Sequence, residues 1–319
     1  MNATREQRIE QALFRGGSLT LDNPAYCQAV RAITESLVQT DLAPEDLTAR
    51  ALGMKNRFAS ASILAREGGV AAGLEEFAFL VRAHGVEVAF EKQDGDVIKP
   101  GDTLLRAEGD ESKLLSLERV SLNLLQRMSG IATASRCMQE RARRRSSGTR
   151  IVGTRKTPWG LLDKRALHLG NGGTHRLGLG DAVVIKNNHL ALLASREEDA
   201  APLAIEEAWK IRAESAFIEV EVRGEAAARA AAQAFRRVQE DAGEQYPCLL
   251  MLDNMAPDGI NKILEMLRRG GLWDHTLIEA SGGISDTNVE AYATCGVDAI
   301  SIGALTHSAR ALDICQRIS

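Results

Sequence analysis

The stretch that decides the fold is Ala182-Val183-Val184-Ile185-Lys186, an apolar run that ends in a cation. Five more short apolar runs lie along the second half of the chain, at residues 151–152, 217–222, 248–252, 277–280 and 299–302. Amphipathic stretches such as 202–212 and 224–238 separate them. Strands that alternate with helices at this spacing are typical of a parallel βα architecture.

Polar residues gather at or near the points where these strands are expected to end. They are Lys186, Glu219 and Glu221, Asp253-Asn254, Ser281-Gly282-Gly283, and Gly303. Because Glu219 and Glu221 are two residues apart, both point to the same face of their strand. Polar groups delivered by successive strand ends build the site of an α/β barrel. The pattern therefore favours a barrel over an open sheet, and no G-x-G-x-x-G dinucleotide fingerprint follows a strand.

Two segments between the first strand and Ala182 combine cations with glycine. They are Gly153-Thr154-Arg155-Lys156-Thr157 and Gly170-Asn171-Gly172-Gly173-Thr174-His175-Arg176. Glycine lets the backbone approach a ligand closely, and arginine binds carboxylates and phosphates through two parallel hydrogen bonds. A pocket for a ligand with several negative charges is predicted by four cations: Arg155, Lys156, Arg176 and Lys186. A lone histidine is more often packed than functional, but its place beside Arg176 favours a role for His175 in this pocket.

The composition is that of an ordinary folded protein. The 319 residues suffice for two domains of about 150 residues each. A net charge of −4 offers no general attraction to nucleic acid or to anionic membranes. No apolar run approaches the ~20 residues of a membrane span, and residues 1–11 lack a signal-peptide core. The five cysteines are scattered without metal spacing, so we expect the reducing cytoplasm.

The first half of the chain has a different pattern. The first ~20 residues are polar and are expected to be peripheral. Helices are predicted at 24–39, 74–84 and 112–144, the last with a possible break at Gly130, and strands at 60–65, 86–90 and 97–106. These elements predict an α+β domain with a mostly antiparallel sheet.

A series of motifs runs in order along residues 41–314. They read Leu117-Glu118-Arg119-Val120, Gln126-Arg127-Met128-Ser129-Gly130, Thr154-Arg155-Lys156-Thr157, His175-Arg176-Leu177-Gly178-Leu179, Ile185-Lys186-Asn187-Asn188-His189, Glu219-Val220-Glu221-Val222, Leu252-Asp253-Asn254, Glu279-Ala280-Ser281-Gly282-Gly283-Ile284 and Gly303-Ala304-Leu305-Thr306-His307. Together they resemble the quinolinate phosphoribosyltransferase family, the carboxylating nicotinate-nucleotide pyrophosphorylases. The chain departs from the commoner family pattern after Thr157, where it reads Pro158-Trp159-Gly160.

The resemblance implies a fold and a reaction. The fold is α/β, an incomplete α/β barrel of about six to seven parallel strands with an N-terminal α+β sandwich domain. The expected divisions are 1–117 for the sandwich domain, 118–308 for the barrel and 309–319 for a segment that returns to the first domain. The reaction is transfer of the phosphoribosyl group of 5-phosphoribosyl diphosphate to quinolinate, with Mg²⁺, giving nicotinate mononucleotide, diphosphate and CO₂. A homodimer or a dimer-based hexamer is implied as the assembly.

The resemblance also implies a role for individual residues. Arg155, His175 and Arg176 correspond to binders of the quinolinate carboxylates, with Arg119 supplied by a partner subunit. Lys156 and Lys186 correspond to residues that grip the phosphoribosyl diphosphate. Glu219 and Asp253 correspond to residues near the ribose hydroxyls and, indirectly, the magnesium. The backbone N–H groups of Ser281, Gly282, Gly283 and Gly303 would bind the 5-phosphate. Lys156, Lys186, Glu219 and Asp253 are therefore the candidate catalytic residues.

Three other interpretations stay open at this point. One is a related phosphoribosyltransferase that acts on another base. Another is an aldolase that forms a Schiff base through Lys186, although such an enzyme needs one amine in a drier pocket and not several extra cations. The third is a carrier or binding protein, indicated weakly by the turn at Lys99-Pro100-Gly101.

Overall fold

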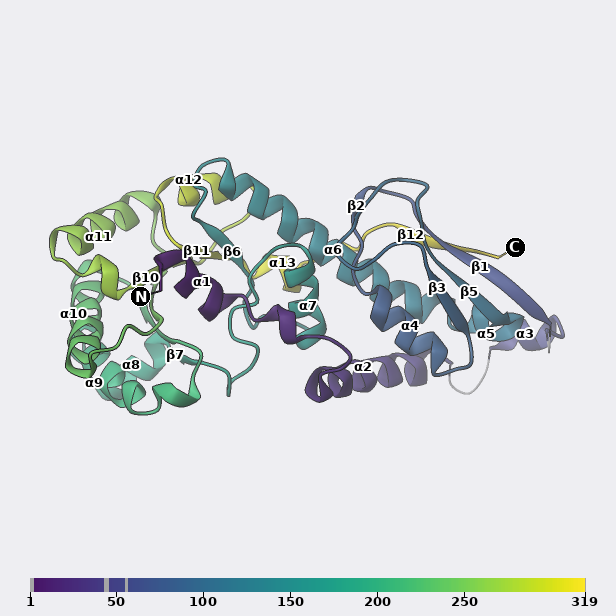
Figure 1. The fold of residues 1–319 in the computed structure, drawn as a ribbon, viewed down its shortest axis with the longest axis horizontal. Helices are drawn as coiled ribbons and strands as arrows, with labels where there is room; N and C mark the ends of the chain where they lie inside the picture. Colours follow the sequence, from purple (N-terminus) through teal and green to yellow (C-terminus); the bar gives the residue numbers. More distant parts are fainter. Residues whose placement is uncertain (1–2, 43–45, 55–56, 319) are drawn as a thin grey trace. The chain divides into compact units, whose positions relative to one another are not determined.

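The computed structural model describes residues 3–42, 46–54 and 57–318, and they form two compact units (Figure 1). Unit 1 consists of Met1–Arg15, Met138–Lys156 and Gly172–Ala304, and unit 2 of Gly16–Cys137, Thr157–Asn171 and Leu305–Ser319. These divisions differ from the predicted boundaries at both ends of the barrel segment. Residues 1–15 join the barrel unit, whereas 118–137 and 157–171 join the other unit.

Unit 1 is built on a sheet of six parallel strands in the order β6-β11-β10-β9-β8-β7. The strands are β6 (Arg150–Val152), β7 (Val183–Ile185), β8 (Ile218–Val222), β9 (Cys248–Asp253), β10 (Leu277–Ser281) and β11 (Ala299–Ser301). Strands β7 to β11 follow chain order, and β6 then pairs with β11, so the sheet curls back toward its beginning. An isolated parallel bridge between Val152 and Gly173 adds a further segment beside β6. The prediction of an incomplete α/β barrel with a separate antiparallel domain is confirmed.

Helices connect the strands of unit 1 and lie along the outside of them (Figure 1). They are α8 (Asn187–Leu193), α9 (Glu197–Lys210), α10 (Glu225–Ala242), α11 (Pro257–Arg269) and α12 (Val289–Thr294). In α10 the buried residues Ala227, Ala231 and Phe235 recur every four positions, which places them on one face of the helix. Pro257 occupies the first turn of α11, where its missing N–H costs no hydrogen bond.

The N-terminal helix α1 (Arg5–Leu13) is part of the unit 1 core, so the prediction that the first residues are peripheral is wrong. Its Ile9, Ala12 and Leu13 pack with residues at the beginnings of the strands, such as Leu277 and Ala299. The helix is also held by charge, because Arg5 pairs with Asp298 at 2.5 Å and lies over the ring of Trp273. The helix therefore closes the end of the barrel opposite the strand carboxyl ends.

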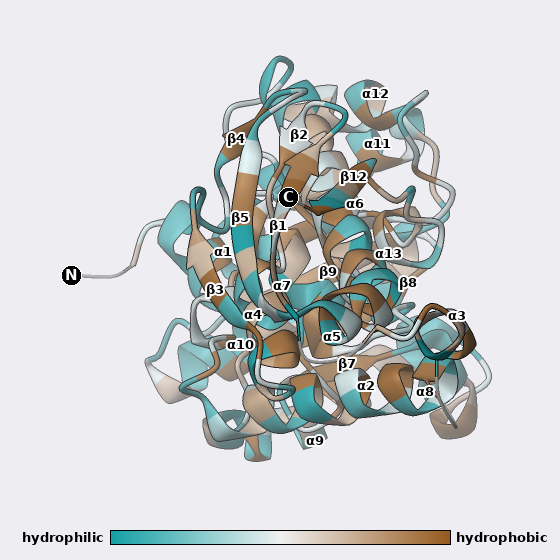
Figure 2. Ribbon diagram, turned by 90° about the vertical axis from the view of Figure 1, so that its right-hand side faces the viewer, coloured by the Kyte–Doolittle hydropathy of each residue, from teal (hydrophilic) through white to brown (hydrophobic). Residues whose placement is uncertain are grey.

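Unit 2 contains an antiparallel sheet in the order β12-β1-β5-β3. Its strands are β1 (Phe58–Ala65), β3 (Glu87–Phe90), β5 (Thr103–Asp110) and β12 (Ile314–Ile318), with a small separate pair formed by β2 (Gly69–Val70) and β4 (Val97–Ile98). In β5 buried Leu105 and Ala107 alternate with exposed Arg106 and Glu108. Figure 2 shows this alternation as brown and teal bands. One face of the sheet is thereby apolar and lies against the core.

The helices of unit 2 complete that core. They are α2 (Pro24–Leu42), α3 (Leu47–Ala51), α4 (Leu74–Arg82), α5 (Glu111–Ser116), α6 (Glu118–Arg143), α7 (Leu161–Leu169) and α13 (Ala304–His307), the last residues of α6 and the first of α13 being assigned to unit 1. Leu74, Phe77 and Leu80 of α4 pack in one cluster with Ile63 of β1 and Leu105 of β5.

The predicted helix 112–144 breaks at Leu117, between α5 and α6, and not at Gly130. Gly130 lies inside α6 because the backbone of Arg310 runs directly against it. A Cβ at Gly130 would lie 1.9 Å from the Arg310 carbonyl oxygen. The Leu312 amide donates to the Gln126 carbonyl one turn earlier. Glycine is therefore required by close approach of a distant segment, and not by the end of a helix.

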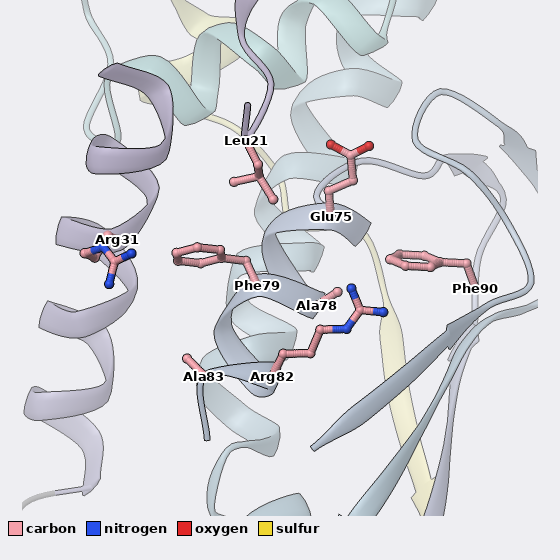
Figure 3. A pocket seen from close by; sticks show the side chains of 8 residues that line it. All are labelled: Leu21, Arg31, Glu75, Ala78, Phe79, Arg82, Ala83 and Phe90. Carbon is pink, nitrogen blue, oxygen red and sulfur yellow. The ribbon is translucent and has the colours of Figure 1, made fainter. Parts of the chain in front are cut away.

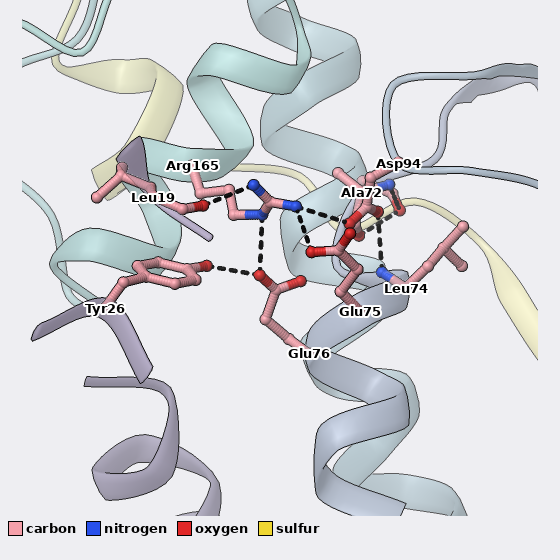
Figure 4. A network of polar contacts seen from close by, with 9 residues as sticks. Leu19, Tyr26, Ala72, Leu74, Glu75, Glu76, Asp94 and Arg165 are labelled. Carbon is pink, nitrogen blue, oxygen red and sulfur yellow. Dashed lines mark hydrogen bonds and ion pairs between the residues drawn. The ribbon is translucent and has the colours of Figure 1, made fainter. Parts of the chain in front are cut away.

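A buried charge network ties α7 to α2 and α4 within unit 2 (Figure 4). The guanidinium of Arg165 donates to the Leu19 carbonyl at 2.6 Å and to Glu75 at 2.7 Å. Its Nε lies 3.0 Å from Glu76, which also accepts a hydrogen bond of 2.6 Å from the Tyr26 hydroxyl. One permanent cation thus holds together segments that lie up to 146 residues apart in the chain.

The same network contains a carboxyl group with a strongly altered pKa. Burial and the nearby charge of Asp94 raise the pKa of Glu76 to about 7, although Arg165 and the Tyr26 hydroxyl act in the opposite direction. Asp94 lies 3.4 Å from Arg165 and accepts the Leu74 amide.

Of the helices that the structure describes, none is long and apolar enough to cross a membrane.

Candidate active site

The carboxyl ends of the six parallel strands bring the predicted polar residues to one edge of unit 1. The strand register aligns Asp253 at the end of β9 with Ser281 at the end of β10. Lys186 follows β7 directly, and Gly303 follows β11 after one residue. Parallel strands in register end at a common edge, which is where α/β barrels place their sites.

Lys186 and Glu221 form an ion pair at this edge, with Nζ 2.9 Å from Oε2. The lysine side chain is 46% exposed and the glutamate side chain 8% exposed, so the pair lies at the mouth of the barrel. His189 completes the start of α8 by accepting the Lys186 amide at Nδ1. Glu221 was noted in the sequence only for its alternation with Glu219, and the register was needed to place it at the mouth.

Asp253 lies beside Arg223, a cation that the sequence analysis missed. Nε of Arg223 is 3.4 Å from the Asp253 carboxylate, and Arg223 is largely exposed. The sequence signal that could have identified Arg223 is its position directly after β8, at the same level as the other residues that follow the strands.

The loops after β9 and β10 are interlocked around the predicted phosphate-binding glycines. The Asn254 amide donates to the Ser281 carbonyl. Gly282 has φ +95, and a Cβ there would lie 2.3 Å from the Asn254 amide oxygen. Only glycine fits this combination of backbone angle and close contact. Gly283 also has a left-handed backbone, so the two residues form a turn beyond the end of β10, with Gly282 half-buried and Gly283 exposed.

Arg155 and Arg176 come close enough to repel one another. Burial, and then the charge of Arg155, lower the pKa of the Arg176 guanidinium. The hydrogen bond of Arg176 Nη1 goes to a neutral group, the Ala182 carbonyl, at 3.2 Å. Arg155 and the neighbouring Lys156 are exposed. Two arginines that raise each other's energy favour the binding of an anion between them.

His175 and two glutamates form a buried cluster inside the barrel. Nε2 of His175 lies 3.1 Å from Glu219 and 3.3 Å from Glu279. Both glutamates are fully buried, on β8 and β10 respectively. Glu219 therefore lies in the interior, one layer below Glu221, although the sequence analysis gave the two glutamates only a common face of their strand.

The two carboxylates favour a proton on the imidazole nitrogen that faces them. Burial alone would lower the pKa of His175, but the charges of Glu219 and Glu279 outweigh burial and raise it to about 9. Burial and the charge of Glu279 raise the pKa of Glu219 to about 7. Glu279 appeared in the sequence only within a motif and was given no role. Its spacing of two from Ser281 was the available signal, since it puts both on one face of β10.

Arg119 belongs to unit 2, where it is the second residue of α6. Its side chain is 59% exposed and lies 3.8 Å from the carboxylate of Glu118. Its predicted role in a partner's site stays a prediction.

A separate surface pocket in unit 2 contains none of the predicted site residues (Figure 3). Arg31 lies over the ring of Phe79 and Arg82 over the ring of Phe90, each at 5.6 Å. Arg82 also donates to the Val88 carbonyl. Both cations of this pocket are thus engaged by the protein itself.

Comparison with known proteins identifies the family. The families described as "Quinolinate phosphoribosyl transferase, N-terminal domain" and "C-terminal domain" match residues 46–129 and 131–316. A probable carboxylating nicotinate-nucleotide pyrophosphorylase of Methanothermobacter thermautotrophicus is 38% identical over 288 residues, which cover 88% of this chain and 96% of that relative. The carboxylating nicotinate-nucleotide pyrophosphorylase of Mycobacterium leprae is 34% identical over 276 residues, covering 84% and 89%.

Solved structures agree with the sequence relatives. The crystal structure of NadC from Streptococcus pyogenes superposes with a TM-score of 0.77 at 30% identity and covers 91% of this chain and 96% of that one. The two domain families together span most of the chain, and they carry the strand-end residues described above. The chain belongs to the quinolinate phosphoribosyltransferase family.

Proposed function

We propose that this protein transfers the phosphoribosyl group of 5-phosphoribosyl diphosphate to quinolinate and releases diphosphate and CO₂, forming nicotinate mononucleotide in NAD biosynthesis. The observation that carries the proposal is the pair Arg155 and Arg176 in unit 1, which lie close enough for the two cations to repel one another. A dicarboxylate fits this arrangement, because each arginine can bind one carboxylate with two parallel hydrogen bonds.

The candidate residues divide between the two substrates. Arg155, His175 and Arg176 belong with quinolinate, and Lys156 and Lys186 with the phosphoribosyl diphosphate. We assign the carboxylate near the ribose to Glu221, because Glu221 contacts Lys186 at the mouth. Backbone N–H groups of the loop 281–283 and of Gly303 bind the 5-phosphate, as glycine-rich strand-end loops do.

The chemistry needs no nucleophile from the protein. The quinolinate nitrogen forms a bond to the anomeric carbon while the bond from that carbon to diphosphate breaks, so positive charge develops on the ribose and negative charge on diphosphate. Carboxylates at the mouth stabilise the first charge and Lys156 and Lys186 the second. The 2-carboxylate then leaves as CO₂, and the resulting carbanion lies beside the positively charged ring nitrogen and takes up a proton.

Magnesium is proposed to enter with the diphosphate. Mg²⁺ prefers oxygen ligands and is commonly bound by one or two carboxylates together with substrate phosphates. Asp253 offers such a carboxylate at the mouth, 14% exposed. When bound, the ion would neutralise charge on the leaving diphosphate. Addition of a chelator should abolish turnover and Mg²⁺ should restore it, whereas full activity in chelator would remove the metal from the proposal.

The aldolase interpretation loses support from the mouth geometry. A Schiff-base lysine requires an uncharged amine in a dry pocket, whereas Lys186 is about half exposed and paired with Glu221.

A homodimer or a dimer-based hexamer and a cytoplasmic location remain proposals. All five cysteines are free, which suits a reducing compartment.

One assay tests the function. Purified protein is incubated with 5-phosphoribosyl diphosphate, Mg²⁺ and either quinolinate or nicotinate, and diphosphate and CO₂ are measured. We expect both products with quinolinate and neither with nicotinate. Diphosphate release with nicotinate but not with quinolinate would instead favour a related base phosphoribosyltransferase.

A further inference from the structure

The buried cluster of His175, Glu219 and Glu279 contains polar atoms that the rest of the protein does not satisfy. Among the described residues, no group makes a well-aligned hydrogen bond to Nε2 of His175 or to either oxygen of Glu219 or Glu279. Buried carboxylates without hydrogen bonds are costly. Each such group calls for an explanation in the structure around it.

A metal ion is one candidate occupant, because the three ligand atoms lie within 4.8 Å of one another. The hydrogen bond on the other side of the imidazole argues against it. The Arg176 backbone amide donates to Nδ1 of His175 at 2.8 Å, so Nδ1 carries the lone pair. The charges of the two glutamates favour a doubly protonated ring, but such a ring has no lone pair to accept the Arg176 amide. The hydrogen bond therefore fixes a single ring proton, on Nε2. The nitrogen that faces the two glutamates is therefore a donor and has no lone pair for a metal.

The cluster holds His175 in an unusual backbone conformation. His175 has φ +54, in the left-handed region that residues other than glycine rarely occupy. Its amide is fixed to the Leu13 carbonyl, and its ring stands edge-on to Phe217 with the centroids 5.2 Å apart. The two carboxylates fix the remaining free edge of the ring. The conformation persists only because the ring is held on several sides.

The conformation of His175 determines where Arg176 lies. The residues are adjacent, and the hydrogen bond from the Arg176 amide to Nδ1 ties the backbone of Arg176 to the orientation of the ring. The guanidinium is then held by the Ala182 carbonyl at the beginning of β7. A continuous series of contacts runs from the two glutamates through the imidazole to Arg176.

We propose that Glu279 and Glu219 are positioning residues that hold the Nε2–H tautomer of His175 in its left-handed turn and thereby set Arg176 for a substrate carboxylate. The inference rests on the proposed function, because the carboxylate is that of quinolinate. Neither glutamate touches substrate in this arrangement. Their removal should impair the binding of the dicarboxylate and leave the binding of phosphoribosyl diphosphate intact.

The central experiment compares Glu279→Ala with Glu279→Gln. Glutamine keeps an acceptor oxygen of the same reach, so it should restore what alanine loses. For Glu279→Ala we expect the KM for quinolinate to rise about tenfold or more, since a buried polar contact is lost. The KM for phosphoribosyl diphosphate should change by less than about twofold. Glu279→Gln should lie close to the wild type in both constants.

Glu76→Ala is the matched control. Glu76 is an equally buried glutamate, but it belongs to the network of unit 2. It should lower the unfolding midpoint as Glu279→Ala does and leave the KM for quinolinate unchanged. An equal rise in the KM for quinolinate in both variants would show a general loss of stability and overturn the proposal.

A second readout does not depend on turnover or on Glu279→Ala folding. Nitrogen-15 NMR of the histidine ring in the wild type should show His175 as the Nε2–H tautomer, and Glu219→Gln and Glu279→Gln should each shift its resonances. A ring protonated on Nδ1 in the wild type would overturn the proposal, as would a stoichiometric divalent metal in the purified protein. If the wild type shows no activity on quinolinate, the proposed function fails, and the ring spectrum still tests how the glutamates hold His175.

Discussion

Each unit of this protein contains a buried group of charges, and the two groups differ in how completely they are satisfied. In unit 2 Arg165 donates to Glu75, Asp94 and a carbonyl, and Glu76 accepts the Tyr26 hydroxyl. Only Nε of Arg165 and one oxygen of Glu76 lack a well-aligned partner in this group, among the described residues. In unit 1 two glutamates share a single imidazole N–H, and none of their four oxygens has a well-aligned partner among the described residues. In both groups burial and a neighbouring carboxylate raise the pKa of one glutamate to about 7.

The difference separates stability from positioning. A permanent cation with several hydrogen bonds compensates buried carboxylates well, and such networks fix a unique packing. An imidazole offers one N–H to the two carboxylates and offsets less of the cost of burying them. The cluster of unit 1 therefore contributes little to stability. It contains His175, which is adjacent to Arg176, and it fixes a strained turn there. We infer that unit 2 uses buried charge to hold its helices together and unit 1 uses it to aim a ligand-binding side chain.

The largest effects should come from the cations of unit 1. Arg176→Ala should weaken quinolinate binding about a hundredfold, because loss of one partner of a charged pair in a closed site costs about 2–5 kcal/mol. Lys156→Ala should instead weaken phosphoribosyl diphosphate, since the two cations are assigned to different ligands. Dissociation constants for each ligand, measured by calorimetry on both variants, give the comparison. Equal losses for both ligands in both variants would contradict the assignment.

Removing the cation of unit 2 should act on stability alone. Arg165→Met leaves Glu75, Glu76 and Asp94 without their shared partner, and breaking a buried ion pair costs about 3–5 kcal/mol in the free energy of unfolding. Urea unfolding measures this loss, and the KM for quinolinate in the folded variant should stay within about twofold of the wild type. Arg106→Met, at an exposed ion pair with Glu91, is the control and should cost about 1 kcal/mol or less.

The stability of unit 2 should depend on pH in a direction set by Glu76. Its pKa rises from 4.5 to about 7 on folding, so the folded protein binds more protons than the unfolded chain in that window. The contribution of Glu76 to the free energy of unfolding should therefore fall as pH rises from about 4.5 to about 7 and level off above.

Glu76→Gln should make this fall shallower, because the substituted side chain cannot titrate. Glu219 contributes a fall in the same direction, so a part of the slope should remain. Urea unfolding at a series of pH values measures the slope for each protein. The control Glu87→Gln, at an exposed position of β3, should follow the wild type. A slope that is the same in Glu76→Gln and the wild type would show that Glu76 ionises normally in the folded protein.

The outcome for individual residues shows what a sequence can and cannot predict here. The strand runs and the edge that gathers Lys186, Asp253 and Ser281 were predictable, because strand periodicity and parallel register place them without reference to distant parts of the chain. The depth of Glu219 was not, since a period of two gives the face of a strand but not the layer within the barrel. That layer depends on register with β7 and β9.

Two errors have a common cause in contacts between distant segments. Helix α1 looked peripheral because most of its nine residues are polar, yet a narrow stripe of Ile9, Ala12 and Leu13 is buried against strand beginnings far along the chain. Gly130 looked like a helix break because glycine is unfavourable inside a helix. The reason for glycine at this position is instead the close approach of the Arg310 backbone. Local propensity carries no information about such contacts.

The last prediction tests whether unit 2 also contributes a residue to substrate binding. Arg119 is the one residue of unit 2 to which we assign a part in substrate binding, and we propose that it serves the site of a partner subunit. A closed two-fold dimer would give each site one such residue from its neighbour. The competing interpretation is an ordinary surface contact with Glu118, which lies 3.8 Å away. A mixing experiment with two inactive variants separates the two.

Arg119→Ala and Lys156→Ala are unfolded together and refolded, and activity is compared with each variant refolded alone. If Arg119 acts in the partner's site, a mixed dimer contains one site with both residues intact and one site that lacks both. Random pairing makes about half of the dimers mixed, so about a quarter of the wild-type activity should return. The control is a mixture of Lys156→Ala with Lys186→Ala, which removes two residues of the same unit 1 site and should return no activity. If heterodimers of Arg119→Ala and Lys156→Ala form without activity, Arg119 does not serve the neighbouring site, and the division of work between the units stands.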